Sequence, residues 1–411
     1  MKRLLFLVCC WQLASSALAQ TPLSEAEVVD LVLANSPAIR ASDLSIRQNQ
    51  QLLNGSYTIP NLDVFTDSPT GGFYTIGVNQ SFQLPMVYKR QYQVQNQQIG
   101  LAQTEKRITE NDLRYRVRLL YLALQYADAV GRQFQFQDSL YNQLRLSAGR
   151  QFAAGQIDYL AKTFTESQAG EVRNQLAQAH ADVQTIARQL QRLTGRSNRG
   201  DGGAAFRPAA RTDSVQVAGL TRNQPAFALM NSLADSLVLG QNPSLAFLRQ
   251  TEALSETQIG LERARSLPGI MVGYYNQGSK ETPAQLRFRF GLTLPVWFRQ
   301  YRSRTVAAQT GLQLARQRTA AQRQTLAVDV QQAQGDFLKY RTSLDYYETT
   351  GLRQSDDLIT TARRLFAAGQ VDYLSFLRTI NEAYAIRQRY LDVLRNYNQS
   401  LLTINYLTGN L

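Results

Sequence analysis

Few side chains in this chain of 411 residues are placed for catalysis or metal binding. His180 is the only histidine, and its neighbours Ala179 and Ala181 fit a solvated helix better than a reactive site. Both cysteines lie within the first ten residues, so the rest of the chain has no set of soft metal ligands. The glycine-rich stretch from 200 to 203 lacks the Lys-Ser/Thr that follows in a phosphate-binding loop. We therefore predict no enzyme activity, no metal site and no cofactor.

Two aspartates stand out because their surroundings are duplicated. Asp158 lies in FAAGQIDYL at 152–160, and Asp372 lies in FAAGQVDYL at 366–374, an offset of 214 (372 − 158). Each aspartate follows a glycine turn and precedes a helical pattern, which is the position of a helix N-cap.

The duplication extends over most of the chain. Leu-Thr-Gly at 193–195 recurs at 407–409, and Leu84-Pro85 recurs as Leu294-Pro295. The order of matches is kept while the offset drifts from 206 (243 − 37, two prolines) to 214, as small loop insertions would produce. We predict a leader at 1–19, a first repeat at 20–195, a linker at 196–236 and a second repeat at 237–411.

Each repeat contains two long helical patterns whose apolar residues step by three and four. Matched examples are Leu113, Val117, Leu120 and Leu124 in the first repeat, and Leu326, Val330, Ala333 and Phe337 in the second. This spacing over several heptads is typical of coiled-coil seams. A helix from Met86 to Gly149 would span ~95 Å at 1.5 Å per residue, so we expect a rod or tube.

Before the long helices the apolar period changes to two. The expected strands are Asn61–Asp67, Tyr74–Leu84, Gly269–Gln277 and Leu286–Leu294. Tyr74–Leu84 and Leu286–Leu294 each resemble the ~10 residues of a tilted membrane strand, and the other two are their weaker partners. No later apolar run reaches the ~20 residues of a membrane helix. Four strands cannot close a barrel, so closure would need several subunits. A soluble hairpin is the alternative, but the Gly/Ser/Asn/Gln-rich polar faces favour a barrel with Arg287 and Arg289 facing its lumen.

The first residues predict export. Lys2 and Arg3 precede an apolar stretch and the small-residue cleavage site Ala17-Leu18-Ala19, which together are typical of a signal peptide. Its removal would take away both cysteines and lower the net charge from +13 to +11 (13 − 2). A basic chain often binds nucleic acid. Export, and the scatter of arginines among glutamines in helical patterns, instead favour solvated helix faces.

Two copies of helix, strand pair, long helix, turn and long helix behind a leader resemble the TolC-like outer membrane efflux protein family. The local marks are Leu23-Ser24-Glu25-Ala26-Glu27 before 31–37, the Leu-Pro pairs and the Phe-x-x-Gly-x-x-x-x-Leu turns. The resemblance covers nearly the whole exported chain. It implies a mostly α fold with a small β part: a homotrimer with a long antiparallel coiled-coil helical barrel in the periplasm and an outer-membrane β-barrel of four strands per chain.

The resemblance also implies a function and partners. Such a trimer is the passive exit duct of a tripartite efflux or type I secretion system, fed by an inner-membrane pump (RND, ABC or MFS type) and a periplasmic adaptor. The turns between long helices would form the tips that contact the adaptor. By motif, these residues are Arg150, Phe152, Gly155, Leu160, Arg364, Phe366, Gly369 and Leu374. They have a structural interpretation too, since the glycines suit left-handed turns and the phenylalanines can staple helix ends.

Asp158 and Asp372 become candidate gate residues under this resemblance, because family members place acidic side chains near the constricted tip. The helix-cap interpretation stays open beside it. Asp356 and Asp357 are weaker candidates. The rival function is a non-transporting periplasmic coiled-coil protein, structural or adhesive. Such a protein has no reason to carry two period-two strand pairs that end in Leu-Pro.

Overall fold

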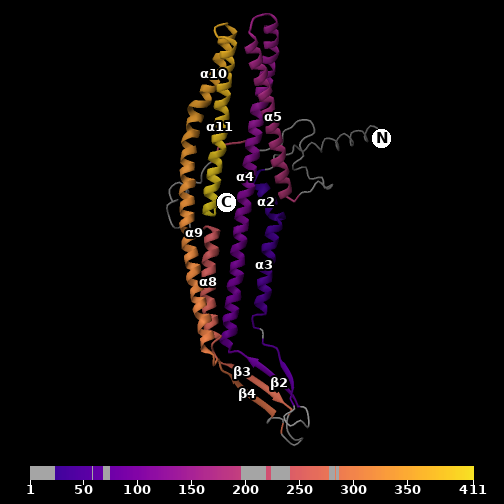
Figure 1. Ribbon diagram of the computed structural model, residues 1–411, viewed down its shortest axis with the longest axis vertical. Helices are drawn as coiled ribbons and strands as arrows, with labels where there is room; N and C mark the ends of the chain where they lie inside the picture. Colours follow the sequence, from indigo (N-terminus) through magenta and orange to yellow (C-terminus); the bar gives the residue numbers. More distant parts are fainter. Residues whose placement is uncertain are drawn as a thin grey trace, which may run out of the picture.

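The computed structural model describes residues 24–57, 59–67, 75–195, 219–223, 241–276, 283 and 287–411 as an elongated, mostly helical molecule (Figure 1). A small sheet lies at one end of the long axis, and the turns that join α4 (Pro85–Ala153) to α5 (Tyr159–Leu193) and α10 (Leu352–Ala367) to α11 (Tyr373–Thr408) lie at the other end. The expectation of a mostly α fold with a small β part is confirmed. The predicted leader and most of the predicted linker lie outside the described residues.

The first repeat begins with a helix whose first residue is determined by a local capping motif. Ser24 and Glu27 form a capping box, in which each side chain accepts a hydrogen bond from the backbone N–H of the other residue. Pro37 and Pro85 occupy the first turns of later helices, where a missing N–H costs little. The elements are α2 (Glu25–Asn35), α3 (Pro37–Asn54), β1 (Asp63–Asp67), β2 (Thr75–Phe82), α4 (Pro85–Ala153) and α5 (Tyr159–Leu193).

The second copy follows the same plan. Asn242 caps its first helix by accepting hydrogen bonds from the N–H groups of Ser244 and Leu245. The elements are α8 (Pro243–Ala264), β3 (Gly269–Tyr275), β4 (Phe288–Thr293), α9 (Phe298–Tyr346), η2 (Tyr347–Gly351), α10 (Leu352–Ala367) and α11 (Tyr373–Thr408).

The predicted long helix is confirmed by α4, an unbroken helix of 69 residues that spans about 100 Å at 1.5 Å per residue. Its buried stripe includes the predicted seam residues Val117, Leu124 and Ala127. These residues pack with Val183 and Leu190 of α5, so the first hairpin is held by a coiled-coil seam.

The matching helix of the second copy differs from the expectation of an uninterrupted seam. It is broken by η2, a π-helical turn of five residues between α9 and α10. Leu-Pro and the tip phenylalanine are 68 residues apart in the first copy (152 − 84) and 72 in the second (366 − 294). Three of the four extra residues lie before α9, which begins at Phe298, whereas α4 begins directly at Pro85. The fourth lies within the helix, since 298–367 has 70 residues and α4 has 69, and the wider π turn takes up this one residue. Gly351 is buried there, where a Cβ would lie 2.8 Å from the Tyr347 ring.

The sheet has the order β1-β2-β3-β4 with antiparallel pairing throughout, so strands of the two copies meet at its centre (Figure 1). Its register confirms the predicted alternation between an apolar and a polar face. Val64, Val78, Tyr274 and Phe288 form one row across the apolar face. The next row, Asp63, Asn79, Gly273 and Arg289, lies on the polar face.

Within the described part of the chain, no helix combines the length and the apolar character needed to cross a membrane.

Candidate functional site at the helical tips

The two turns that end the hairpins have the same backbone. Gly155 has φ 70° and Gly369 has φ 67°, both in the left-handed region. In each turn the N–H after the glycine donates to a carbonyl five residues back: Gln156 to Gln151 at 2.8 Å, and Gln370 to Leu365 at 3.0 Å. This is the Schellman arrangement that ends many helices. Among the described residues other than the adjacent ones in the chain, none has an atom within 4 Å of a Cβ placed on either glycine, so glycine is needed for its φ and not for space.

Both duplicated aspartates cap the helix that follows the turn. Asp158 Oδ1 accepts a hydrogen bond from the Ala161 N–H at 2.7 Å, and Asp372 Oδ2 accepts one from the Ser375 N–H at 3.0 Å. Hydrogen bonds from the side chain and backbone of Ser375 hold the pKa of Asp372 below its ordinary value. Both aspartates are therefore helix N-caps in this structure. The gate assignment of Asp158 and Asp372 stays a prediction, because a ring of carboxylates would need further copies of the chain.

The side chains around the first turn are open to solvent. The Phe152 ring is 37 % exposed and meets the Tyr159 ring edge-on, with 6.0 Å between centroids. Lys162 Nζ lies 5.0 Å from the centre of the Phe152 ring. Tyr159 is 68 % exposed, and Leu160 and Arg150 are also exposed. The first tip thus presents an aromatic, apolar and basic surface.

The matched residues of the second turn are packed. Phe366 stacks on Phe376 at 4.6 Å, and Tyr373, the counterpart of Tyr159, is only 6 % exposed. The Tyr373 hydroxyl donates to the Leu144 carbonyl of α4 at 3.2 Å, which ties the second tip to the first hairpin. Leu374 is half-buried, while Arg364 remains exposed. At this tip the staple interpretation of the phenylalanine agrees with the packing.

Tyrosines form a polar seam between α4 and α11, which the sequence interpretation missed. The Tyr126 hydroxyl donates to Asp392 Oδ1 at 2.5 Å, and burial and the Asp392 carboxylate raise the pKa of Tyr126 to about 12. Nearer the tips, Tyr141 donates to Asn381, whose amide donates to Gln168 Oε1 at 3.2 Å. Tyrosines within otherwise apolar seam stripes were the available signal, but their partners lie about 240 to 270 residues away in sequence.

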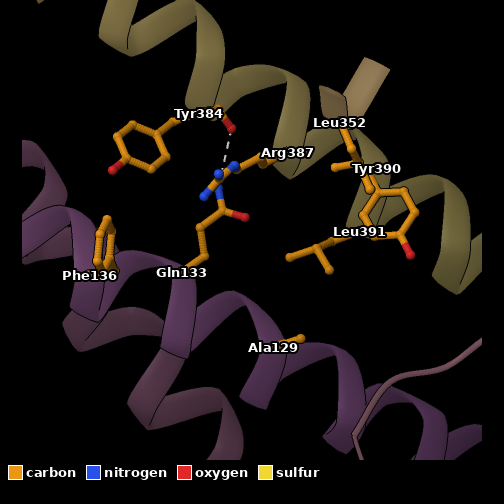
Figure 2. A pocket seen from close by; sticks show the side chains of 8 residues that line it. All are labelled: Ala129, Gln133, Phe136, Leu352, Tyr384, Arg387, Tyr390 and Leu391. Carbon is orange, nitrogen blue, oxygen red and sulfur yellow. Dashed lines mark hydrogen bonds between the residues drawn. The ribbon is translucent and has the colours of Figure 1, made fainter. Parts of the chain in front are cut away.

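A groove of about 280 Å³ lies between α4 and α11, close to this seam. Figure 2 shows its aromatic walls and the hydrogen bond, 3.2 Å long, from the Gln133 amide to the Tyr384 carbonyl. Arg387 lines the groove and also pairs with Asp356 of α10, one of the weaker gate candidates. The other weak candidate, Asp357, is exposed.

The predicted lumen arginines lie at the opposite end of the molecule. Arg289 is on the polar face of the sheet, with its guanidinium 3.9 Å from the centre of the Tyr275 ring. The Arg287 guanidinium donates a hydrogen bond to Asn276 Oδ1. The lumen assignment stays a prediction. Among the residues that the structure describes, no three His, Cys, Asp or Glu side chains are grouped to hold a metal ion.

Comparison with known proteins agrees with this architecture. Residues 235–410 match the family model described as outer membrane efflux protein. These residues are an outer membrane efflux protein domain. The resemblance to the TolC-like efflux proteins is thereby confirmed. The prediction that the chain is not an enzyme is confirmed by the transport function of this family. No curated protein sequence gives a significant match.

Solved structures share the fold over almost the full chain. The outer membrane channel CmeC of Campylobacter jejuni has 13 % identity and a TM-score of 0.75, covering 96 % of this chain and 90 % of its own. A membrane protein from Pseudomonas aeruginosa has 15 % identity and a TM-score of 0.76, covering 95 % and 91 %. The open state of the Neisseria gonorrhoeae channel MtrE has 15 % identity and a TM-score of 0.72, covering 94 % and 88 %. At these identities the likeness shows the efflux-protein fold alone.

Proposed function

We propose that this efflux protein is the outer-membrane subunit of a tripartite efflux or type I secretion system. Three copies would form a passive exit duct, with the sheets in the outer membrane and the helices in the periplasm. An inner-membrane pump, of RND, ABC or MFS type, would deliver the cargo through a periplasmic adaptor. The observation that carries the proposal is the uncovered apolar face of the sheet at the end of the long coiled-coil hairpins.

No residue that the structure describes covers that face. Phe288, Phe290 and Leu292 project from β4 on one side, and the Phe290 side chain is 80 % exposed. Arg289, Gly291 and Thr293 alternate with them on the polar side. Apolar residues outward and polar residues inward form the pattern of a membrane barrel with an aqueous lumen. Lipid contact would account for the exposed aromatic rings.

The edges of the sheet call for further copies. β1 and β4 lie at the two edges, and edge strands with open hydrogen-bonding groups must be paired or covered in a membrane. Pairing β4 of one copy with β1 of the next would close the sheet, and three copies would give a twelve-stranded barrel. Closed symmetric rings of this kind use one head-to-tail interface repeated around an axis.

The tips would then lie in the periplasm, about 100 Å of helix away from the membrane. We propose that Arg150, Phe152, Gly155 and Leu160 contact the adaptor there. Their matched partners Arg364, Phe366, Gly369 and Leu374 are part of the same proposal, with Phe366 acting mainly through the shape of the tip.

Cysteine cross-linking tests the trimer, since a chain cleaved after Ala19 has no natural cysteine. Phe65→Cys on β1 is combined in turn with Arg289→Cys, Gly291→Cys and Thr293→Cys on β4, because all four positions lie on the polar face. One combination should cross-link outer-membrane fractions into dimers and trimers, and into nothing larger. Phe65→Cys with Met271→Cys of β3 is the control, because β3 is enclosed by its neighbours.

Two outcomes would contradict the proposal. A chain that enters the outer membrane but remains uncross-linked in every combination would lack the β1–β4 interface. A chain recovered only as a soluble periplasmic rod would support the non-transporting coiled-coil alternative.

A further inference from the structure

The apolar band of the sheet continues past the end of β4. Val296, Trp297 and Phe298 follow the Leu-Pro step, and Trp297 is 80 % exposed and Phe298 71 % exposed. They join directly onto Leu292 and Leu294, which are also exposed. Trp and Phe side chains in this position suit the boundary between acyl chains and headgroups. The start of α9 therefore extends the apolar surface to the rim of the membrane band.

Arginines follow these aromatic residues at once. Arg299, Arg302 and Arg304 are all exposed, and no salt bridge among the described residues uses any of them. From 282 to 328 the sequence has eight arginines and no Asp or Glu. On the neighbouring helix α8, Glu262 is already paired with Arg265 at 2.8 Å. Within the part of the chain that the structure describes, no salt bridge thus compensates the positive charge at the start of α9.

Helical geometry places the two kinds of side chain at different depths. Phe298 and Arg302 are four residues apart, so they lie on one face of α9 and about one turn, ~5 Å, apart along its axis. Arg299 lies beside Phe298 in the same turn. An apolar ring in the acyl boundary would then have a guanidinium at the level of the phosphates, and guanidinium groups bind phosphate through paired hydrogen bonds.

In the first repeat, the Leu-Pro pair is also followed by an aromatic and a basic residue, but this surface is weaker. Tyr88-Lys89 and Phe298-Arg299 share the offset of the Leu-Pro pairs, 210 (298 − 88 and 294 − 84). The Tyr88 hydroxyl is engaged by the Gln83 N–H at 3.1 Å, however, and the ring is half-buried. The exposed aromatic and basic surface is therefore mainly a property of the second repeat.

We infer that Trp297, Phe298, Arg299 and Arg302 form a binding site for the headgroups of anionic glycerophospholipids in the inner leaflet of the outer membrane. The inference rests on the proposed membrane location of the sheet and adds a lipid partner to it. Charge complementarity and continuity with the apolar face select an anionic bilayer surface over a second copy of the chain. The site would fix the height of the sheet in the membrane.

Trp297 provides a built-in probe for this site. The chain has two tryptophans, and Trp11 lies in the predicted leader, so the chain from Gln20 onward has Trp297 alone. That protein is reconstituted into phosphatidylcholine vesicles that contain about 20 mol % phosphatidylglycerol as the anionic lipid. Bromine is placed on the acyl chains of phosphatidylglycerol in one sample, and on an equal amount of phosphatidylcholine in the other.

We expect brominated phosphatidylglycerol to quench Trp297 fluorescence more strongly than the same amount of brominated phosphatidylcholine. A basic residue near an anionic surface favours anionic lipid about fivefold, so the preference should be several-fold with both arginines present. In Arg299→Gln/Arg302→Gln the two quenchers should become nearly equal, while both still quench. The matched control is Arg318→Gln/Arg323→Gln, about 30 Å further along α9, which should keep the full preference.

The possible failures separate the lipid site from the proposed function. Equal quenching by the two lipids in the unaltered protein would overturn the lipid site and leave membrane insertion standing. Absence of quenching by either lipid, in protein that floats with the vesicles, would mean that a second copy covers Trp297, and would also overturn the site. Protein that never associates with vesicles would overturn the proposed membrane location together with the site.

Discussion

The two helical tips have nearly the same turn sequence but different surroundings. Backbone geometry is the same at both, with a left-handed glycine and an aspartate cap. The matched tyrosines differ most: Tyr373 is buried against α4, whereas Tyr159 projects into solvent. Local sequence therefore determines the shape of each turn, and the neighbouring hairpin determines which of its side chains remain available to a partner.

The largest expected effect distinguishes the two phenylalanines. Phe366→Asp places a carboxylate in the cluster with Tyr373 and Phe376 and should lower the free energy of unfolding by about 3 kcal/mol or more. Phe152→Asp should cost less than about 1 kcal/mol, because the Phe152 ring is partly solvated. Thermal unfolding of each variant in detergent measures the difference. Export assays should then show Phe152→Asp folded but impaired, and equal destabilisation of both variants would remove the difference between the tips.

The glycines should behave alike at the two tips, since only φ matters there. Gly155→Ala and Gly369→Ala are each expected to cost about 1–2 kcal/mol through strain in the left-handed region, with no steric clash. The same unfolding assay applies. As a control, Gly149→Ala within α4 should be neutral or slightly stabilising. A large difference between the two tip variants would contradict the shared backbone.

Alkaline pH should loosen the seam that holds the second hairpin against α4. The pKa of Tyr126 is raised from its ordinary value to about 12, so its contribution to stability is complete below pH 10 and is lost as the pH rises to about 12. Tyr126→Phe should cost about 1 kcal/mol at pH 7 and flatten this part of the stability profile. Unfolding curves between pH 8 and pH 12 provide the measurement, and identical profiles for both proteins would refute the assignment.

The smallest structural effect is expected for Asp158→Asn and Asp372→Asn. Asparagine caps helices about as well as aspartate, so stability at pH 7 should change by only a few tenths of a kcal/mol. The lowered pKa of Asp372 adds stability at neutral pH that is lost as the pH falls through that pKa. If the aspartates also form a gate, the Asn channels in planar bilayers should lose block by multivalent cations and part of their cation preference. Unchanged block in the double variant would leave both residues as caps.

Much of the fold could be predicted because it depends on local periodicity. The 69-residue helix α4, the four strands and the duplicated turns all follow from residue spacing within each segment. The π turn η2 could not be located in this way. The offset between the repeats changes from 213 in the seam (330 − 117) to 214 at the tips (366 − 152), which signals one inserted residue, but its position depends on how Gly351 and Tyr347 pack.

The candidate site was less predictable than the fold. Motif matching identified the tip residues but assigned equal roles to Phe152 and Phe366. Their difference arises because α11 packs against α4, a contact between segments more than 200 residues apart. The Tyr126–Asp392 pair escaped prediction for the same reason. Spacing within one helix indicates which residues face a neighbour, but not which side chains they meet.

The pairing of β2 with β3 has a consequence for how such a molecule could arise. This strand pair joins the two repeats within one chain. The pairing is antiparallel, as is the pairing proposed to join β4 of one chain to β1 of the next. A gene for a single repeat would encode a half-size protein able to build the same ring from twice as many identical pieces. Fusion of two such genes would replace half of the intermolecular encounters by a covalent tether, which raises the effective concentration of the partner strands. It would also let the two halves acquire different substitutions.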